Sequence, residues 1–287
     1  MFRLVFVFIL LPVIVFSQRY LPTGRGEVIQ HTELTLSYVE KHEQAEWVYY
    51  ESSSELTDGA YKRKDNFRAD GKVATVSASL ADYSGSGYDR GHLAPAQDMK
   101  ATAGIMSESF YLSNMSPQLP SFNRGGNWRK LEDAVHNWGH NNVVVVTGPV
   151  FQNNLGVIGM NNVTIPSAFY KVVYWPTQKK MIGFVIPHKS DGRSLQECIV
   201  PVDKIERITA IDFFPQLENI LEDNIEAEVI LNGWSFSKPN ITAKNSSATA
   251  VQKTNKCNGV TKNGTQCKRN ATQGEHFCYQ HGEKEIE

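Results

Sequence analysis

The chain has 287 residues, 41% of them hydrophobic, which is enough for one sizeable core with room for a small appendage. Its formal net charge is −1, so no global basic field marks it as a binder of polyanions. A nucleic-acid substrate must therefore be inferred from a local site, because net charge governs steering and solubility and not the chemistry of a site.

The first residues carry an apolar segment behind one positive charge. Arg3 precedes residues 4–16, which contain no charged side chain. This run is shorter than the roughly 18 residues that a membrane span needs. We interpret residues 1–17 as a cleaved signal peptide, with an anchoring helix or a buried core strand as the alternatives. The interpretation predicts a mature chain that begins near Gln18, is secreted or periplasmic, and has no stable membrane association.

Residues 26–239 have the composition of one globular domain, with aromatic and β-branched residues throughout. The apolar run at 142–148 ends in glycine and indicates a buried strand. Residues 163–175 and 181–187 indicate two more strands. The polar, proline-led segment at 176–180 is typical of the turn of a hairpin that joins them.

Two helices are indicated in the same region. Large apolar side chains recur at steps of three, four and three between positions 128 and 138, which predicts a helix over 126–138 that Gly139 closes. Residues 203–211 indicate a second helix. Strands and helices without regular βαβ alternation predict an α+β fold of packed layers. Cys198 is expected to be a small buried hydrophobe, because three of the four cysteines lie in the last part of the chain and cannot form a disulfide framework for this domain.

A candidate catalytic segment runs over residues 83–99, with the sequence YSGSGYDRGHLAPAQDM. Hydrolysis of a phosphodiester needs a base for water, a cation for the developing negative charge, and a metal for the leaving oxygen. His92 can be the base, Arg90 can face a phosphate with two donors, and Gly91 allows close approach of the backbone. The alternative is a polar turn in which His92 only caps a strand.

A second segment, FYLSNMSPQLPSFNRGGNWRKLE over residues 110–132, supplies oxygen ligands. Asn114 and Asn123 carry amide oxygens and Glu132 lies on the predicted helix. Hard oxygen ligands suit magnesium, which keeps several waters and accepts few protein ligands. The alternative for either asparagine alone is a turn or a helix cap. Nine positions separate Asn123 from Glu132, so one continuous helix would point them apart, and we expect Gly125 and Gly126 to break it.

These motifs together resemble the DNA/RNA non-specific endonuclease family. DRGHLAP, SNMSPQ, and an F-N-x-G followed by W-x-x-L-E carry the resemblance, which extends over most of residues 26–234 and includes QAEWVYY and FFPQLE. It implies the α+β fold of that family, with a ββα-metal (His-Me) finger, mixed or antiparallel sheets and packed helices. It also implies a sequence-tolerant endonuclease that cuts DNA and RNA, and leaves a homodimer open.

The resemblance implies roles for the base and the metal. His92 is the general base that activates water. Asn123 is the direct protein ligand of one Mg²⁺, for which Mn²⁺ could substitute, and Glu132 contacts the ion through water.

Four further residues receive roles in the same way. Asn114 and Asp89 orient the base and its surroundings, Arg90 contacts the phosphate, and Arg63 matches the upstream arginine that contacts substrate or the transition state.

Two positions depart from the family pattern. His136 stands where an arginine is usual, which puts one phosphate contact in doubt, and Phe110 stands where some members carry an asparagine, which predicts a different pocket wall. Three rival functions stay open: a catalytically dead binder of nucleic acid, a phosphodiesterase acting on small nucleotides, and a nuclease effector or toxin targeted by its C-terminal module.

The C-terminal part changes in composition. Residues 240–256 are polar and small, which predicts a linker. Residues 257–281 follow as a small module in which Cys257, Cys267, Cys278 and His281 form a complete tetrahedral set for a structural Zn²⁺. The alternative is one disulfide plus an odd thiol.

Overall fold

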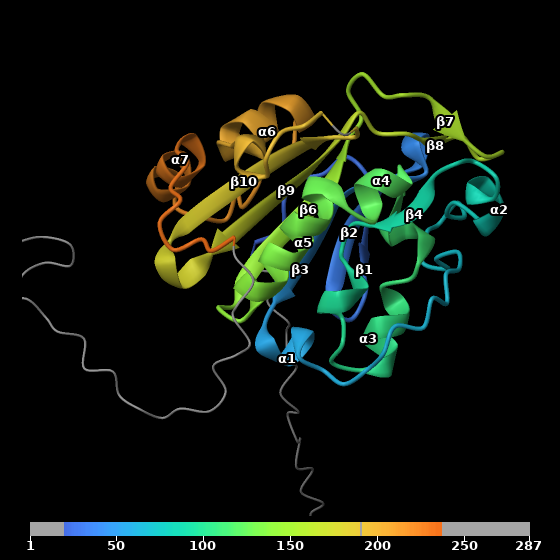
Figure 1. Ribbon diagram of the computed structural model, residues 1–287, viewed down its shortest axis with the longest axis horizontal. Coiled ribbons are helices and arrows are strands. Elements are labelled where there is room, and N and C mark those ends of the chain that lie inside the picture. Colours follow the sequence, from blue (N-terminus) through green and yellow to red (C-terminus); the bar gives the residue numbers. More distant parts are fainter. Residues whose placement is uncertain (1–19, 190, 237–287) are drawn as a thin grey trace, which may run out of the picture. The chain divides into compact units, whose positions relative to one another are not determined.

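The computed structural model describes residues 20–189 and 191–236 (Figure 1). The predicted signal peptide at 1–17, the linker at 240–256 and the Cys/His module at 257–281 lie outside the described residues. Within them, no helix has both the length and the apolar character needed to cross a membrane.

A seven-stranded antiparallel sheet forms the centre of the fold. In spatial order it contains β1 (Glu27–Gln30), β2 (Leu34–Val39), β3 (Gln44–Ser52), β6 (Val143–Val150), β9 (Ala168–Trp175), β10 (Lys180–Pro187) and β11 (Ile199–Val200). The central strands are buried along almost their whole length, because helices cover both faces of the sheet. This explains why β6 and β9 have near-continuous apolar sequences rather than alternating ones.

One face of the sheet packs against α5 (Gly126–Gly139). The predicted stripe lies on the buried side of this helix, where Trp128 and Leu131 pack in one cluster with Phe169 and Val173 of β9. The helix begins at Gly126, whose φ of 64° no β-carbon-bearing residue adopts easily, and its observed bounds match the prediction to one residue.

The opposite face packs against α6 (Val202–Thr209) and α7 (Asn219–Ala227). Ile205 of α6 and Ile225 of α7 join a second cluster with Tyr170 and Val172, which alternate along β9 with the residues that face α5. The second predicted helix is therefore confirmed, but it ends two residues early because Ala210 adopts a left-handed conformation with φ of 57°.

A ββα finger lies beside α5. Its strands, β4 (Asp89–His92) and β5 (Met115–Gln118), pair antiparallel, and α4 (Pro120–Asn123) leads into α5. The remaining short elements are α1 (Ser54–Thr57), α2 (Leu80–Tyr83), α3 (Ala103–Glu108), β7 (Val157–Ile158), β8 (Val163–Thr164), and single 3₁₀ turns at Glu40–His42, Ala96–Asp98, Leu112–Asn114, Pro176–Gln178 and Gln196–Cys198.

The strand predicted over 163–175 is two strands. β8 ends at Thr164 and pairs with β7, whereas β9 starts at Ala168 and belongs to the central sheet. Pro166 lies between them and has no amide hydrogen to donate to a ladder, which accounts for the interruption. The hairpin from β9 to β10 is confirmed, and Cys198 is a buried free thiol in the core, as expected.

Candidate active site

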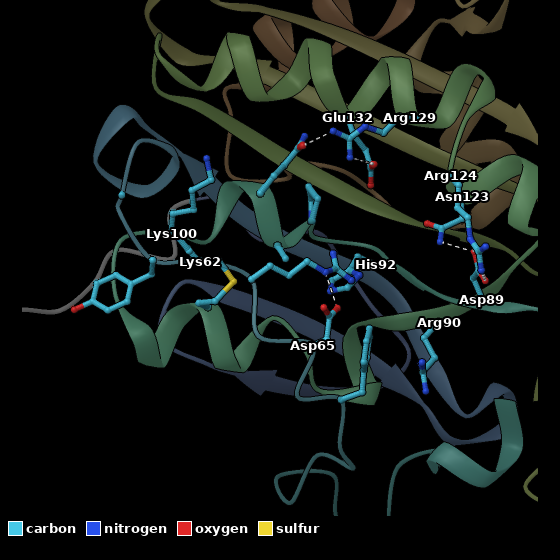
Figure 2. A pocket seen from close by; sticks show the side chains of 18 of the residues that line it. Lys62, Asp65, Asp89, Arg90, His92, Lys100, Asn123, Arg124, Arg129 and Glu132 are labelled. Atoms are coloured by element: carbon cyan, nitrogen blue, oxygen red, sulfur yellow. Dashed lines mark hydrogen bonds and ion pairs between the residues drawn. The ribbon is translucent and has the colours of Figure 1, made fainter. Parts of the chain in front are cut away.

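A cavity of about 910 Å³ lies where the finger meets the loop at residues 59–67 (Figure 2). Six of the seven residues expected to serve the reaction line it, and Asn114 does not. The charged side chains around it are Lys62, Arg63, Arg90, Lys100, Arg124 and Arg129, against Asp65, Asp89 and Glu132. A chain with a net charge of −1 therefore has a locally basic cavity, which favours a polyanionic ligand.

The finger holds His92 by its backbone. His92 ends β4 opposite Met115, and the Leu93 amide donates to the Asn114 carbonyl at 2.9 Å. The Asn114 side chain is fully buried and bonds the backbone of Ala94 twice, accepting from its N–H at 2.9 Å and donating to its C=O at 3.0 Å. Asn114 thus fixes the chain next to the base without touching the imidazole or the cavity.

The His92 ring is enclosed by aromatic side chains. Phe110 meets it edge-on at 5.0 Å between ring centroids, and Phe67 lies at 5.6 Å. His92 is 7% exposed, and its Nε2 has no hydrogen-bond partner among the described residues. Burial, with a smaller effect from the positive charge of Arg63, lowers the pKa of His92 to about 3. The imidazole is therefore neutral at pH 7 and able to accept a proton.

Asp89 fixes the orientation of the Asn123 amide. Asn123 Nδ2 donates to Asp89 Oδ2 at 2.9 Å, and Arg124 donates to both oxygens of the same carboxylate. Burial opposes ionisation of Asp89, but the hydrogen bonds from Arg124 and Asn123 hold its pKa below the usual range. Because the amide nitrogen is committed to Asp89, the amide oxygen of Asn123 is the atom left to act as a ligand (Figure 2).

Glu132 approaches the cavity from α5. The predicted helix break is confirmed: α4 ends at Asn123 and α5 starts at Gly126, so Asn123 and Glu132 stand on different helices and line one cavity. Glu132 is 5% exposed, and its Oε2 lies 3.9 Å from a guanidinium nitrogen of Arg129. Arg129 also lines the cavity, donates to Gln97 at 2.9 Å and pairs with Asp133, so its guanidinium is held by these two partners.

A buried lysine lies behind Glu132. Lys171 of β9 is fully buried, and its Nζ has no hydrogen-bond partner among the described residues. The ammonium lies 4.9 Å from the centre of the Trp128 ring, a cation–π distance. Burial lowers the pKa of Lys171, while the negative charges of Glu132 and Asp98 raise it.

Two arginines flank the aromatic enclosure of His92. The Arg63 guanidinium carbon lies 5.0 Å from the centre of the Phe110 ring, and that of Arg90 lies 4.4 Å from the centre of the Phe67 ring. Arg63 donates to Asp65 at 2.6 Å and is half exposed. Both guanidiniums retain donors for phosphate oxygens, which is the recognition that their planar geometry favours.

The two departures from the family pattern have visible consequences. His136 Nδ1 donates to the carboxylate of buried Asp98 at 2.6 Å and does not line the cavity, so it provides no phosphate contact there. Phe110 is fully buried and packs edge-on against the His92 ring, and it does not line the cavity itself. The expected difference in the pocket wall stays a prediction.

Sequence reasoning missed several residues of the site. Arg124 and Arg129 are adjacent to matched motif residues, and their cationic side chains on a glycine-interrupted helix start were an available signal. Lys171 was detectable as the single charge in the run AFYKVVYW. Phe67 gave no signal, because its role arises from packing against a residue 25 positions later in the chain.

The donors present fit a magnesium ion. The cavity offers one amide oxygen, from Asn123, and one buried carboxylate, from Glu132, with open volume for water and a phosphate between them. Few protein ligands, all oxygen, in a site with room for water are what magnesium prefers.

Comparison with known proteins gives consistent matches. The family model of DNA/RNA non-specific endonucleases matches residues 15–219. Human mitochondrial endonuclease G is 32% identical over 213 residues, which cover 68% of this chain and 71% of that protein. Nuclease C1 of Cunninghamella echinulata var. echinulata is 34% identical over 218 residues, covering 69% and 86%. The crystal structure of the EndoG/EndoGI complex matches with a TM-score of 0.63 at 30% identity, covering 68% of this chain and 89% of that one, and confirms the expected fold.

The expectation of a secreted or periplasmic protein is wrong by the same comparison. Human endonuclease G and other relatives are mitochondrial nucleases. An apolar run behind one basic residue describes the physical character of an N-terminal segment and not its destination, which is why residues 1–17 misled the prediction.

Proposed function

The chain belongs to the DNA/RNA non-specific endonuclease family and is a metal-dependent endonuclease, and from this premise we propose that it hydrolyses DNA and RNA with His92 as general base and Asn123 as the ligand of one Mg²⁺. The observation that carries the proposal is the meeting of these two residues with Glu132 in one basic cavity.

His92 takes the proton of the attacking water. Its backbone is fixed by the Asn114 bonds and its ring by Phe110 and Phe67, so little reorientation is needed at the moment of reaction. Because burial keeps the imidazole neutral, the base is available throughout the physiological pH range.

Asn123 and Glu132 would hold the metal, Asn123 directly and Glu132 through water. When bound, Mg²⁺, or Mn²⁺ in its place, supplies Lewis-acid stabilisation of the charge on the phosphate and the leaving oxygen. Asp89 keeps the Asn123 oxygen directed at the cavity, which is a more specific role than the general orientation expected from the sequence. Arg63, Arg90 and Arg129 stabilise the phosphate charge and determine no base sequence.

Digestion of plasmid DNA and of a structured RNA, with and without EDTA, tests the proposal. We expect both polymers to be cut only when Mg²⁺ is present, without a fixed cleavage sequence. A dinucleotide substrate included in the same assay tests the rival phosphodiesterase: turnover of the dinucleotide with intact polymers would overturn the proposal, as would cleavage at one short sequence.

Substitution of the ligand gives a sharper test. Asn123→Ala should raise the Mg²⁺ concentration for half-maximal cleavage by roughly tenfold or more, because even residues that only support a metal ligand contribute that much to affinity. Asn127→Ala is the matched control, since Asn127 lies on α5 outside the cavity and donates to the Arg193 carbonyl. Equal magnesium titrations for the two variants would show that Asn123 is not a ligand.

Two further proposals concern parts that the described residues do not include. Cys257, Cys267, Cys278 and His281 would hold one Zn²⁺, so metal analysis should find about one zinc per chain, lost in Cys278→Ser. Truncation after Pro239 should leave Mg²⁺-dependent turnover in place.

The oligomeric state is a separate question. Light scattering at two protein concentrations tests whether the chain forms a homodimer.

A further inference from the structure

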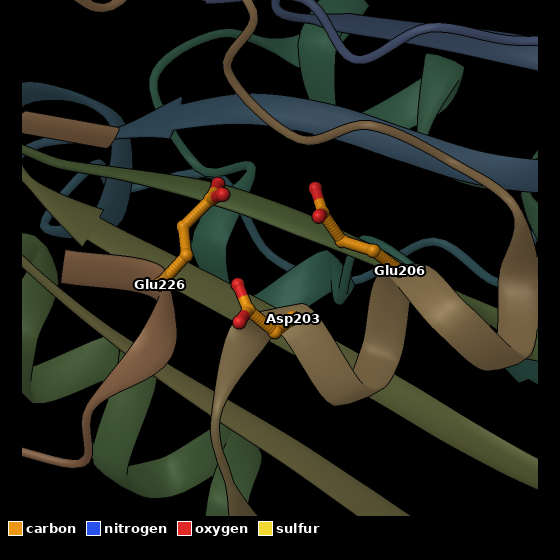
Figure 3. Close-up of side chains that lie close together, drawn as sticks. All are labelled: Asp203, Glu206 and Glu226. Atoms are coloured by element: carbon orange, nitrogen blue, oxygen red, sulfur yellow. The ribbon is translucent and has the colours of Figure 1, made fainter. Parts of the chain in front are cut away.

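Three carboxylates converge on the face of the sheet opposite the active site (Figure 3). Asp203 and Glu206 stand one turn apart on α6, and Glu226 approaches from α7. One carboxylate oxygen from each residue takes part, and these three oxygens all lie within 4.8 Å of one another. Both helices pack against β10, so these side chains are brought together by the fold and not by a flexible surface loop.

Glu226 is the unusual member of the group. It is 5% exposed, yet its Oε1 has no hydrogen-bond donor among the described residues. Glu206 accepts from the Phe213 amide at 2.8 Å, so one of its oxygens is fixed toward the backbone. None of the three carboxylates forms an ion pair with a lysine or arginine in the part of the chain that the structure describes. A buried carboxylate in this setting is costly unless a proton or a cation neutralises it.

The surrounding charges add to that cost. Burial, together with smaller effects from the negative charges of Glu206, Glu222, Asp203 and Asp212, raises the pKa of Glu226 to about 9. Burial and acidic neighbours likewise raise the pKa of Glu206 to about 7, against one hydrogen bond from Phe213 that lowers it. The local field therefore favours the arrival of positive charge from solution.

We propose that Asp203, Glu206 and Glu226 bind a divalent cation, with calcium as the preferred ion. The donors are carboxylate oxygens only, whereas zinc prefers nitrogen and sulfur ligands, so zinc is disfavoured at this site. Asp203 and Glu206 are partly exposed, so water can complete the six to eight oxygens that calcium accepts at flexible geometry. Magnesium demands stricter octahedral geometry and fewer protein ligands, which this three-carboxylate group satisfies less well.

A cation at this site would link α6 to α7 through its carboxylate ligands. The two helices follow one another along the chain, and Glu226 is the last but one residue of α7, close to the end of the described chain. A cation bound only in the folded state stabilises it by mass action. The proposal is independent of the endonuclease mechanism, because the cluster lies behind the sheet and shares no residue with the catalytic cavity.

Calcium titration of the full-length, metal-stripped Asn123→Ala protein tests the proposal, because this background weakens the proposed magnesium site. Thermal unfolding and isothermal titration are measured with CaCl₂ alone. We expect one calcium per chain and a rise in melting temperature of roughly 5–10 °C at a hundredfold excess over Kd. MgCl₂ at equal concentration should give a smaller rise.

Two variants make the result specific. Glu226→Gln should abolish the calcium-dependent rise in melting temperature. Asp203→Asn should reduce this rise, and it serves as the second test if Glu226→Gln folds poorly. Asp223→Asn is the matched control, because Asp223 is an exposed carboxylate of the same helix outside the cluster. In the wild-type background Glu226→Gln should leave Mg²⁺-dependent DNA cleavage unchanged. A wild-type melting temperature that does not change with calcium would overturn the proposal. So would a calcium-dependent rise that is still present in both cluster variants.

Discussion

Glu132 and Glu226 are two buried glutamates on opposite faces of one sheet, and each is 5% exposed. Burial raises the pKa of both. The neighbours then act in opposite directions. Lys171 and Arg129 lower the pKa of Glu132, although Asp98 and Asp133 oppose them, whereas the charged neighbours of Glu226 all raise its pKa.

The contrast shows that burial alone does not decide the charge of a carboxyl group. On the α5 face the chain carries its own buried cation, which favours the ionised form of Glu132, although burial still raises the pKa of this carboxyl to about 7. On the α6–α7 face the chain provides no such cation among the described residues, so Glu226 must hold a proton or receive an ion from solution.

The largest expected effect is a difference in cleavage activity between a variant on the α5 face of the sheet and one on the α6–α7 face. His92→Ala should lower the cleavage rate about 10²–10⁴-fold or more, because general-base catalysis is lost. Glu226→Gln should cut at the wild-type rate. Both are measured as initial rates on plasmid DNA at saturating Mg²⁺, with circular dichroism to confirm folding. A His92→Ala enzyme that retains near-wild-type turnover would remove the base from the mechanism.

The second effect follows from removing the buried cation, Lys171, which distinguishes the surroundings of Glu132 from those of Glu226. Lys171→Met leaves Glu132 buried with less compensation and should lower the free energy of unfolding by up to about 3 kcal/mol in metal-free protein, as loss of one member of a buried charge pair does. Combination with Glu132→Gln should be non-additive, with a coupling of about 1 kcal/mol. Combination with Glu226→Gln should be additive, because the two residues lie on opposite faces. Urea unfolding of the single and double variants measures both.

The smallest effect is the pH dependence of stability, which differs between a residue on the active-site side, His92, and Glu226. The folded-state pKa of His92, about 3, lies below its unfolded value, so its contribution to stability is complete above about pH 6.5 and is lost as pH falls toward 3. Glu226 has a raised pKa, so its contribution is complete at low pH and is lost as pH rises through about 9.

Urea unfolding of metal-free protein at pH 5, 7 and 9 separates the two residues. Wild type should lose about 2 kcal/mol more than His92→Gln between pH 7 and 5, since only an unfolded histidine gains the proton. Glu226→Gln should flatten the alkaline loss instead. Parallel curves for wild type and His92→Gln on the acid side would show that the folded protein accepts a proton at His92.

Much of the site was predictable because its residues occur in short segments with fixed chemistry. His92 and Asn123 were found from DRGH and F-N-x-G, and the break between α4 and α5 followed from two consecutive glycines. The roles given to these residues stay predictions. Asn114 could be named but not placed, since nothing in SNMSPQ distinguishes an amide directed at the cavity from one that binds the backbone of Ala94.

The rest depended on long-range pairing. Lys171 affects the pKa of Glu132 only because β9 lies under α5, and Glu226 reaches Asp203 only because α7 packs beside α6. Neither pairing has a periodicity in the chain. Pro166 was visible, but its power to divide one predicted strand into two became evident only from the different partners of β8 and β9.

The lysine in the middle of β9 also restricts how the strand can assemble. Side chains alternate along β9 between the two clusters, with Tyr170 and Val172 on one face and Lys171 between them on the other. A slip of one residue against β6 or β10 would turn Lys171 into the apolar layer around Phe213 and expose Tyr170 to Glu132. The charge of Lys171 on the α5 face thus disfavours misregistered folding intermediates. Its removal should make refolding of this sheet less faithful and should also make the folded sheet less stable.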